Sequence, residues 1–471
     1  MTTRQQAVDA AAAWFDDGSF LAELQRRVAH RTESQEPNRL PQLTAYLAEE
    51  IGPSIERLGF TWRLIENSVP GFGPFLIGER HEGDGLPTVL TYGHGDVVRG
   101  YDEQWRAGLD PWRIVVEGER WYGRGTADNK GQHSINLAAL ARVLEARGHL
   151  GFNVKLLIET GEETGSPGLR AICAQYRDQL KADVLIGSDG PRLKTDVPTL
   201  FLGTRGAFNF DLSITLREGG HHSGNWGGLL ANPGTILANA IASMVDARGR
   251  ILVERLRPPP IPNSVRRALA GVEPGEPGGP EIDYEWGEPD QSPAERVFAW
   301  NALEVLAYRT GNPDRPVNAI PPQASAHMQL RFVVGSDWPN FIPIIREHLD
   351  WHGFPMVEAR SARMEMMPAT RLDPEHPWVL WAAASIARTT GKTPTILPNL
   401  GGSLPNDCFS DTLGLPTVWV PHSYTACSQH APDEHMLAPI IREGLQMMTG
   451  LFWDLGAGGD LPGSGERPAA Y

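Results

Sequence analysis

The residues of this chain best suited to chemistry are carboxylates and histidines that directly follow apolar segments. The mostly apolar run 154–158 is typical of a buried strand in a parallel sheet, and it leads into a glycine-bounded turn that contains Glu162 and Glu163. Because neighbouring side chains leaving a strand point in different directions, these two carboxylates can do different work at one site, one on a metal ion and one as a proton acceptor. Taken alone, a solvated acidic loop is the simpler interpretation of this turn.

Three further residues strengthen the chemical interpretation. His94 and Asp96 stand two residues apart at the end of a predicted strand, 88–92, so both side chains project from the same side. One of the two residues can then bind a metal ion while the other orients the side chain that binds it. A buried histidine hydrogen-bonded to an aspartate in a purely structural role would have the same sequence pattern. Asp128 lies in the glycine-rich stretch 121–131, which lacks the lysine–serine/threonine ending and the strand context of a nucleotide-binding loop.

These residues, together with two more, form a plausible set of metal ligands. Two histidines and three carboxylates suit a pair of zinc ions with one carboxylate shared, and manganese or cobalt would also fit: His94, Asp128, Glu163, Asp189 and His430. Two such ions can share a water molecule, lower its pKa and polarise a carbonyl group. That chemistry also needs an acidic group outside the ligand set as general base, and Glu162 is available for it.

The segments that must position these residues alternate between strands and helices. Polar residues gather where the strands end, and Asp189 directly follows the strand predicted at 184–188. This pattern predicts an open α/β sheet with its site at the carboxyl edge. The predicted helices are 7–14, 20–29, 40–58, 132–146 and 168–180, and the predicted strands are 60–64, 75–79, 88–92, 153–159 and 184–188.

A different pattern begins near residue 203 and interrupts the α/β part. Alternating strands at 207–216, 324–334 and 357–364, with helices at 232–245 and 338–352, predict an inserted α+β domain over 203–364. Within it, the proline-, glycine- and acid-rich stretch 258–291 is interpreted as a surface excursion. The catalytic α/β domain is therefore expected to consist of 1–202 and 365–455, followed by a disordered tail, 456–471.

Composition limits the possible partners. The net charge of −15 argues against nucleic acid and acidic membranes, which a negative field repels. The first residues lack the basic-then-apolar order of a signal peptide, and no apolar run is long enough to span a bilayer. Cys173, Cys408 and Cys427 show no paired spacing, as expected for a reducing, cytoplasmic environment, and are interpreted as small buried residues.

The ordered motifs resemble those of a co-catalytic zinc hydrolase family. This family includes acetylornithine deacetylase, succinyl-diaminopimelate desuccinylase, carboxypeptidase G, carnosinase-type dipeptidases and β-alanine synthase. The resemblance covers about residues 20–453 and rests on His94-x-Asp96, Gly125-x-x-Asp128-x-Lys130-Gly131, Glu162-Glu163-x-Gly165-Ser166, Asp189 and His430. It implies the fold class: an α/β, di-zinc exopeptidase-type catalytic domain with an inserted α+β lid/dimerisation domain.

The resemblance also implies a role for each matching catalytic residue. Asp128 would be the shared carboxylate, preceding a cis peptide bond to Asn129. His94 and Asp189 would complete one metal site, and Glu163 and His430 the other. Asp96 would support the histidine, and Glu162 would be the general base.

For the lid, the resemblance implies a homodimer and a set of substrate contacts. His222 would reach across the dimer to the oxygen of the scissile carbonyl, and the Ser-Gly that follows favours it over the adjacent His221. Asn318 and Arg331 would grip the substrate, with Arg331 as a fork for its carboxylate. The carboxylate would also rest on Gly401, Gly402 and Ser403.

The sequence therefore predicts metal-dependent hydrolysis of an amide or peptide bond next to a free carboxylate. The length of 258–291 is closer to carnosinase-like dipeptidases than to compact deacetylases, which favours a dipeptidase or carboxypeptidase-like exopeptidase. An aspartate, Asp433, stands where the family commonly has asparagine. The alternatives are an N-acyl or N-carbamoyl amino-acid deacylase, a non-catalytic binding protein on the same fold, and a structural dimer scaffold.

Overall fold

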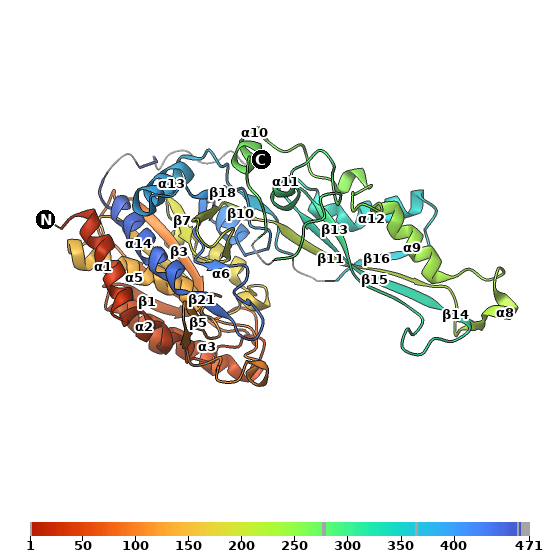
Figure 1. The fold of residues 1–471 in the computed structure, drawn as a ribbon, viewed down its shortest axis with the longest axis horizontal. Helices are drawn as coiled ribbons and strands as arrows, with labels where there is room; N and C mark the ends of the chain where they lie inside the picture. The colour runs from red at the N-terminus through yellow and green to blue at the C-terminus, as the bar shows by residue number, and fades with distance from the viewer. Residues whose placement is uncertain (1, 276–278, 363–365, 459–460, 463–471) are drawn as a thin grey trace.

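Two β-sheets divide the chain between two parts that lie along the long axis of the molecule (Figure 1). The computed structural model describes residues 2–275, 279–362, 366–458 and 461–462. The smaller part extends away from the larger part (Figure 1).

The larger part is built on an eight-stranded mixed sheet. Its three central strands, β6, β3 and β7, run parallel, so their carboxyl ends meet at one edge of the sheet. In spatial order the strands are β1 (Thr61–Ile65), β2 (Phe75–Arg80), β6 (Asn153–Glu159), β3 (Thr88–His94), β7 (Val184–Gly187), β19 (Thr417–Trp419), β9 (Thr199–Phe201) and β18 (Thr395–Leu397).

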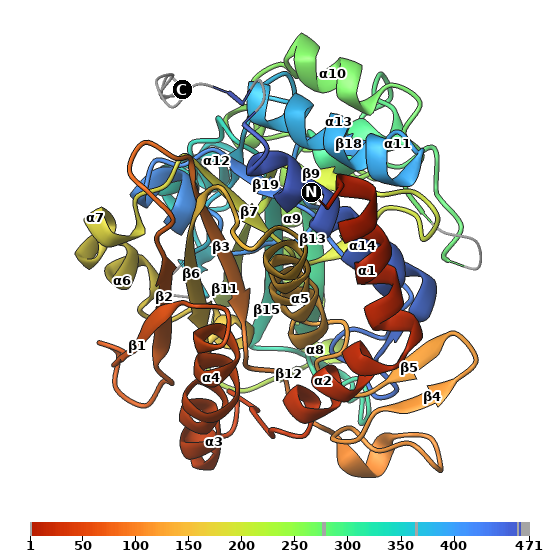
Figure 2. The same ribbon diagram turned by 90° about the vertical axis from the view of Figure 1, so that its left-hand side faces the viewer.

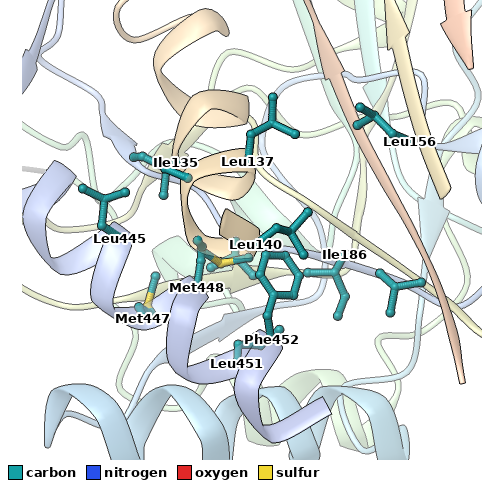
Figure 3. Close-up of a cluster of buried hydrophobic side chains, with 14 of the residues drawn as sticks. Ile135, Leu137, Leu140, Leu156, Ile186, Leu445, Met447, Met448, Leu451 and Phe452 are labelled. Carbon is teal, nitrogen blue, oxygen red and sulfur yellow. The ribbon is translucent and has the colours of Figure 1, made fainter. Parts of the chain in front are cut away.

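Helices cover one face of this sheet and enclose its main core (Figures 2 and 3). Alternate residues of the buried strands point to this face, as Leu156 and Ile186 do against α5 and α14. Each such fully buried aliphatic side chain contributes about 1.5–3 kcal/mol to stability. The helices are α1 (Arg4–Asp16), α2 (Ser19–Val28), α3 (Leu40–Ala45), α4 (Gly52–Glu56), α5 (Lys130–Arg147), α13 (Pro377–Thr390) and α14 (Ala438–Leu455).

The smaller part is a four-stranded antiparallel sheet with two helices packed against it. Strand β11 alternates buried and more exposed residues along its whole length, as a sheet covered on one face should. Its spatial order is β13 (Ala302–Thr310), β15 (Gln323–Phe332), β11 (Gly206–Thr215) and β16 (Glu358–Ser361), with α9 (Pro233–Met244) and α12 (Phe341–Trp351) over it.

The chain crosses between the two parts four times. The short strands β10 (Gly203–Thr204) and β17 (Thr370–Arg371) pair where the chain enters and leaves the smaller part. Between them, residues 257–275 and 279–301 return to the larger part. There, α10 (Asn263–Leu269) and α11 (Pro293–Phe298) pack with α6 (Leu169–Gln175) in the core on the second face of the large sheet. Leu256 and Leu303, at either end of this excursion, belong to the core of the smaller part.

This excursion corrects one prediction. The stretch 258–291 was expected to be a surface excursion, but Ile261, Val265 and Leu269 are buried against the large sheet. Their spacing of four residues is a helical signal that the surrounding prolines and glycines obscured.

Smaller differences concern helix continuity and the tail. The helix predicted at 168–180 is interrupted at Tyr176, where α7 (Arg177–Leu180) begins, and the one predicted at 40–58 contains a π-helical turn, Tyr46–Ile51. Of the tail predicted to be disordered, Leu461 packs against the main core, whereas 459–460 and 463–471 lie outside the described residues. The predicted domain boundary at 364 and 365 also lies outside them. None of the helices in the described ranges has the length and apolar character needed to cross a bilayer.

Candidate metal centre and active site

Three neighbouring parallel strands deliver the first residues of the site. His94 is the last residue of β3, and Asp189 follows β7 by two positions. The turn with Glu162 and Glu163 comes directly after β6. Since these strands are adjacent and parallel, their carboxyl ends place all four side chains at one edge of the sheet, as the sequence predicts.

Asp128 reaches the same place from a glycine-rich loop. The loop follows β5 (Arg120–Tyr122), and β5 pairs with β21 (His435–Leu437), which follows the loop of His430. This pairing brings together two segments that are some three hundred residues apart in sequence. The peptide bond between Asp128 and Asn129 is cis, which confirms that prediction.

The two oxygens of Asp128 face one histidine each. Asp128 Oδ1 lies 3.0 Å from His94 Nε2, and Asp128 Oδ2 lies 3.0 Å from His430 Nε2. Asp189 Oδ2 is 3.4 Å from His94 Nε2, and Glu163 Oε2 is 3.0 Å from His430 Nε2. The five residues thus form two groups that share Asp128, and in each group three potential ligand atoms lie within 4.8 Å of one another.

The composition of these groups fits a pair of divalent metal ions. Histidine nitrogens and carboxylate oxygens are the usual ligands of zinc, and a shared carboxylate is the usual link between two such ions. Glu163 Oε1 is buried and has no hydrogen-bond partner among the described residues, so it is an acceptor that a cation would satisfy. Burial raises the pKa of Glu163 to about 7, while hydrogen bonds to Asp128 and Glu163 raise the pKa of His430 to about 11. Concentrated negative charge of this kind favours a cation.

Asp96 holds two parts of the site together. Its two carboxylate oxygens accept the backbone N–H groups of Glu162 at 3.2 Å and Glu163 at 3.1 Å. On its other side, Asp96 Oδ1 lies 3.4 Å from His94 Nδ1, which also lies 3.1 Å from the Asp96 carbonyl oxygen. Asp96 therefore fixes the orientation of the histidine ring and of the acidic turn, the supporting position that the sequence predicts.

Glu162 shares a cleft with four of the candidate ligands. It lines a cleft of about 3550 Å³ together with Asp128, Glu163, Asp189 and His430. Burial raises the pKa of Glu162 well above its usual range, and the nearby carboxylates of Glu163 and Asp189 act in the same direction. A carboxylate with a raised pKa can both accept and return a proton near neutral pH.

A buried glutamate that was not predicted as a site residue organises the loop of Asp128. Glu434 Oε1 accepts the backbone N–H groups of Gly125, Ala127 and Asp128 at 3.0, 3.0 and 3.1 Å. Its other oxygen, Oε2, accepts a hydrogen bond of 2.6 Å from Arg124 Nη1. Glu434 follows His430 by four positions, so one short segment supplies both a candidate ligand and the anchor of the loop that carries another. The only sequence signal was an acidic pair after the histidine.

The expected substrate residues fall into two separate places. Arg331, Gly401, Gly402 and Ser403 line the same cleft as the metal candidates, and Arg331 Nη1 donates a hydrogen bond of 3.0 Å to Ser403 Oγ.

His222 and Asn318 do not line this cleft within one chain. His222 belongs to β12 (His221–His222), which pairs with β14 (Ala319–Ile320), and the Asn318 carbonyl accepts the Ser223 N–H at 2.9 Å. Figure 1 places β14 and α8 (Ser223–Trp226) at the end of the smaller part farthest from the large sheet.

Comparison with known proteins identifies the family. The sequence profile of peptidase family M20/M25/M40 matches residues 90–454, which is well over half of the chain. The chain belongs to this family. The resemblance inferred from the ordered motifs is therefore confirmed.

Two relatives of this M20 chain are named as dipeptidases. It is 30% identical over 264 residues to cysteinylglycine-S-conjugate dipeptidase of Corynebacterium striatum. The matched segment covers 54% of this chain and 56% of that protein. It is 30% identical over 247 residues to Beta-Ala-His dipeptidase of Mus musculus. That matched segment covers 50% of this chain and 50% of the mouse protein. The chain thus matches about half the length of these relatives.

A solved structure shows the fold more completely. Human carnosine dipeptidase 1 superposes with a TM-score of 0.75 at 20% identity, covering 95% of this chain and 98% of that one. Together with the family match, this confirms the predicted α/β fold class with its α+β insertion.

Proposed function

We propose that this protein is a di-metal exopeptidase that hydrolyses the peptide bond of a dipeptide or similarly short peptide with a free carboxylate. The observation that carries this proposal is the arrangement of Asp128, whose two oxygens face His94 and His430 at 3.0 Å each beside Glu162. The names of the two dipeptidase relatives support the substrate class.

Each metal ion would be held by one half of the site. His94 and Asp189 would bind one ion, Glu163 and His430 the other, and Asp128 both. Zinc suits this donor set best, and manganese or cobalt would fit it. When bound, the pair of ions would lower the pKa of the attacking water and polarise the scissile carbonyl.

The residues of the chain itself perform the remaining work. Glu162 would take a proton from the attacking water and return it to the leaving amine. Asp96 keeps Glu162 and His94 in place through the contacts described above. Arg331, Ser403 and the adjacent glycines would receive the free carboxylate across the cleft, because a guanidinium can donate two parallel hydrogen bonds to it.

A homodimer would complete this site. His222 and Asn318 lie at the far end of the smaller part, where Trp226, Leu229 and Val317 are exposed large apolar residues. The edge strand β13 adds exposed Val305, Leu306 and Tyr308. Pairing of two such surfaces would cover apolar area and could bring His222 of one subunit to the cleft of the other. The three cysteines are free and buried, which supports a reducing cytoplasmic location.

Substrate profiling tests the proposed reaction. Purified protein loaded with zinc is assayed on a panel of dipeptides and, in parallel, on N-acyl and N-carbamoyl amino acids, each with and without chelator. We expect chelator-sensitive cleavage of dipeptides. Cleavage confined to the acylated panel would instead identify a deacylase. Bound metal without cleavage of either panel would contradict the assignment as a peptidase.

A further inference from the structure

We propose that Arg205 is a positioning residue that sets the carboxylate-binding loop, residues 400–403, and thereby selects substrates with a free carboxylate. This inference rests on the proposed exopeptidase function and concerns a residue that does not itself line the cleft. Arg205 lies between β10 and β11, at the junction where the chain enters the smaller part.

Three hydrogen bonds join Arg205 to Leu400, Gly401 and Ser403 of the loop. Its backbone N–H donates to the Leu400 carbonyl at 3.2 Å, and its Nε donates to the Gly401 carbonyl at 3.0 Å. Its own carbonyl oxygen accepts a hydrogen bond of 2.7 Å from Ser403 Oγ. The backbone of Arg205 makes two of these bonds and its side chain makes one, so this residue is tied to the loop at three of its four positions.

The third bond connects Arg205 to the substrate-facing arginine. Ser403 Oγ, which donates to the Arg205 carbonyl, also accepts the 3.0 Å hydrogen bond from Arg331 Nη1. With its hydroxyl hydrogen committed to Arg205, Ser403 presents a lone pair to Arg331. Gln329 Oε1, which accepts a hydrogen bond of 3.1 Å from Arg331 Nε, and Ser403 both hold Arg331, and the Ser403 contact links it to the backbone carbonyl of Arg205.

Charge supports the same conclusion. Burial and the neighbouring positive charge of Arg331 lower the pKa of Arg205 to about 10, against the opposing effect of Glu304. Arg205 therefore stays protonated at neutral pH, and its guanidinium group and that of Arg331 repel each other. An anionic group bound at Arg331 would relieve this repulsion, whereas a neutral amide would not.

Packing restricts the loop from another side. A methyl group built on Gly401 would lie 3.5 Å from Val297 Cγ1 and 3.9 Å from both Arg205 Nη2 and Phe298 Cε1, so α11 and the Arg205 guanidinium face the same side of Gly401. The alternative explanation is that Arg205 only stabilises the junction between the two parts. The two explanations differ in what a substitution does to substrates with and without a carboxylate.

The test compares a dipeptide with its C-terminal amide in Arg205→Gln, Arg205→Lys and wild type, all loaded with zinc. Arg205→Gln removes the hydrogen bond from Nε to the Gly401 carbonyl and the positive charge, while the two bonds made by the backbone of residue 205 remain possible. Loss of this charge-assisted hydrogen bond predicts that KM for the free dipeptide rises about tenfold or more. The kcat and metal content should stay near those of wild type, and the acid-to-amide preference in kcat/KM should shrink. Arg205→Lys keeps the charge but lacks the guanidinium fork, so it should recover only part of this preference.

Arg257→Gln is the matched control. Arg257 lies in the same inserted region, and its Nε also donates to a backbone carbonyl, that of Ile251, at 2.6 Å. We expect its acid-to-amide preference to equal that of wild type. If Arg205→Gln does not fold, Arg205→Lys carries the test through the same ratio.

Two results would overturn the inference and can be told apart. An unchanged acid-to-amide preference in both Arg205 variants, with wild type active and discriminating, would refute the role of Arg205 alone. A wild-type enzyme that contains metal but cleaves neither substrate would refute the proposed function, and this inference with it.

Discussion

Replacing Glu434 by glutamine should weaken metal binding, although the hydrogen bonds of Glu434 go to Arg124 and to backbone N–H groups and not to the side chain of a candidate ligand. The carboxylate accepts three backbone N–H groups of the Asp128 loop on one oxygen and Arg124 on the other. Arg124 and Glu434 are both almost completely buried. Glutamine keeps one acceptor oxygen and turns the other position into a donor, so it cannot satisfy both sides.

The contacts set the size of the effect. If the glutamine oxygen faces the backbone, the Arg124 guanidinium is left as a buried charge without its partner, which costs about 3–5 kcal/mol. If it faces Arg124, three N–H groups lose a charged acceptor, at about 1.5–3 kcal/mol each before relaxation. Both arrangements displace the loop that carries Asp128, and lost supporting contacts of this kind typically reduce metal affinity about 10–100-fold.

The assay is competition for zinc against a chromophoric chelator, with unfolding by denaturant measured on the same samples. Asp454→Asn is the matched control. Asp454 pairs with Arg4 through contacts of 2.8 and 3.0 Å, and its substitution should lower stability without changing zinc affinity. Wild-type zinc affinity in Glu434→Gln would refute the positioning role, even if that variant were less stable.

Other substitutions test separate parts of the site. Glu162→Gln should retain both metal ions and lose about 10²–10⁴-fold in kcat, measured by steady-state kinetics with metal analysis, and near-normal turnover would exclude it as the base. Gly131→Ala would place a methyl group 1.9 Å from the Thr126 carbonyl oxygen, so the free energy of unfolding, measured by thermal unfolding, should fall by about 1–3 kcal/mol. An unchanged free energy of unfolding would mean that the loop can move without cost. Mixing inactive His222→Ala with inactive Asp128→Asn should restore activity after subunit exchange if His222 acts across a dimer, and a mixture that stays inactive would argue against that arrangement.

The sequence was sufficient for the fold class and for the place of most candidate ligands. His94, Glu163 and Asp189 each follow a strand, and the carboxyl ends of adjacent parallel strands meet regardless of the details of packing. His430 was included in the ligand set for its residue type and is not placed at a strand end. Its approach to Asp128 depends on the pairing of β5 with β21, a contact between distant segments that local patterns do not encode.

Other features depended on tertiary contacts as well. Glu434 accepts hydrogen bonds from backbone N–H groups, which almost every residue has, so the residues around it in the sequence do not indicate its partners. The stretch with α10 was interpreted as surface because of its prolines and glycines, while its apolar residues fill the second face of the large sheet. The role of Arg205 likewise depends on a loop almost two hundred residues away.

Metal analysis of the purified protein tests the central claim most directly. Zinc is added to chelator-treated protein in steps, and bound metal is counted while dipeptide cleavage is followed in the same samples. The account predicts two ions per chain for wild type, cleavage that appears with them, and loss of tight binding of both ions in Asp128→Ala, because both groups share that carboxylate. No tightly bound ion in wild type, or undiminished binding in Asp128→Ala, would contradict it.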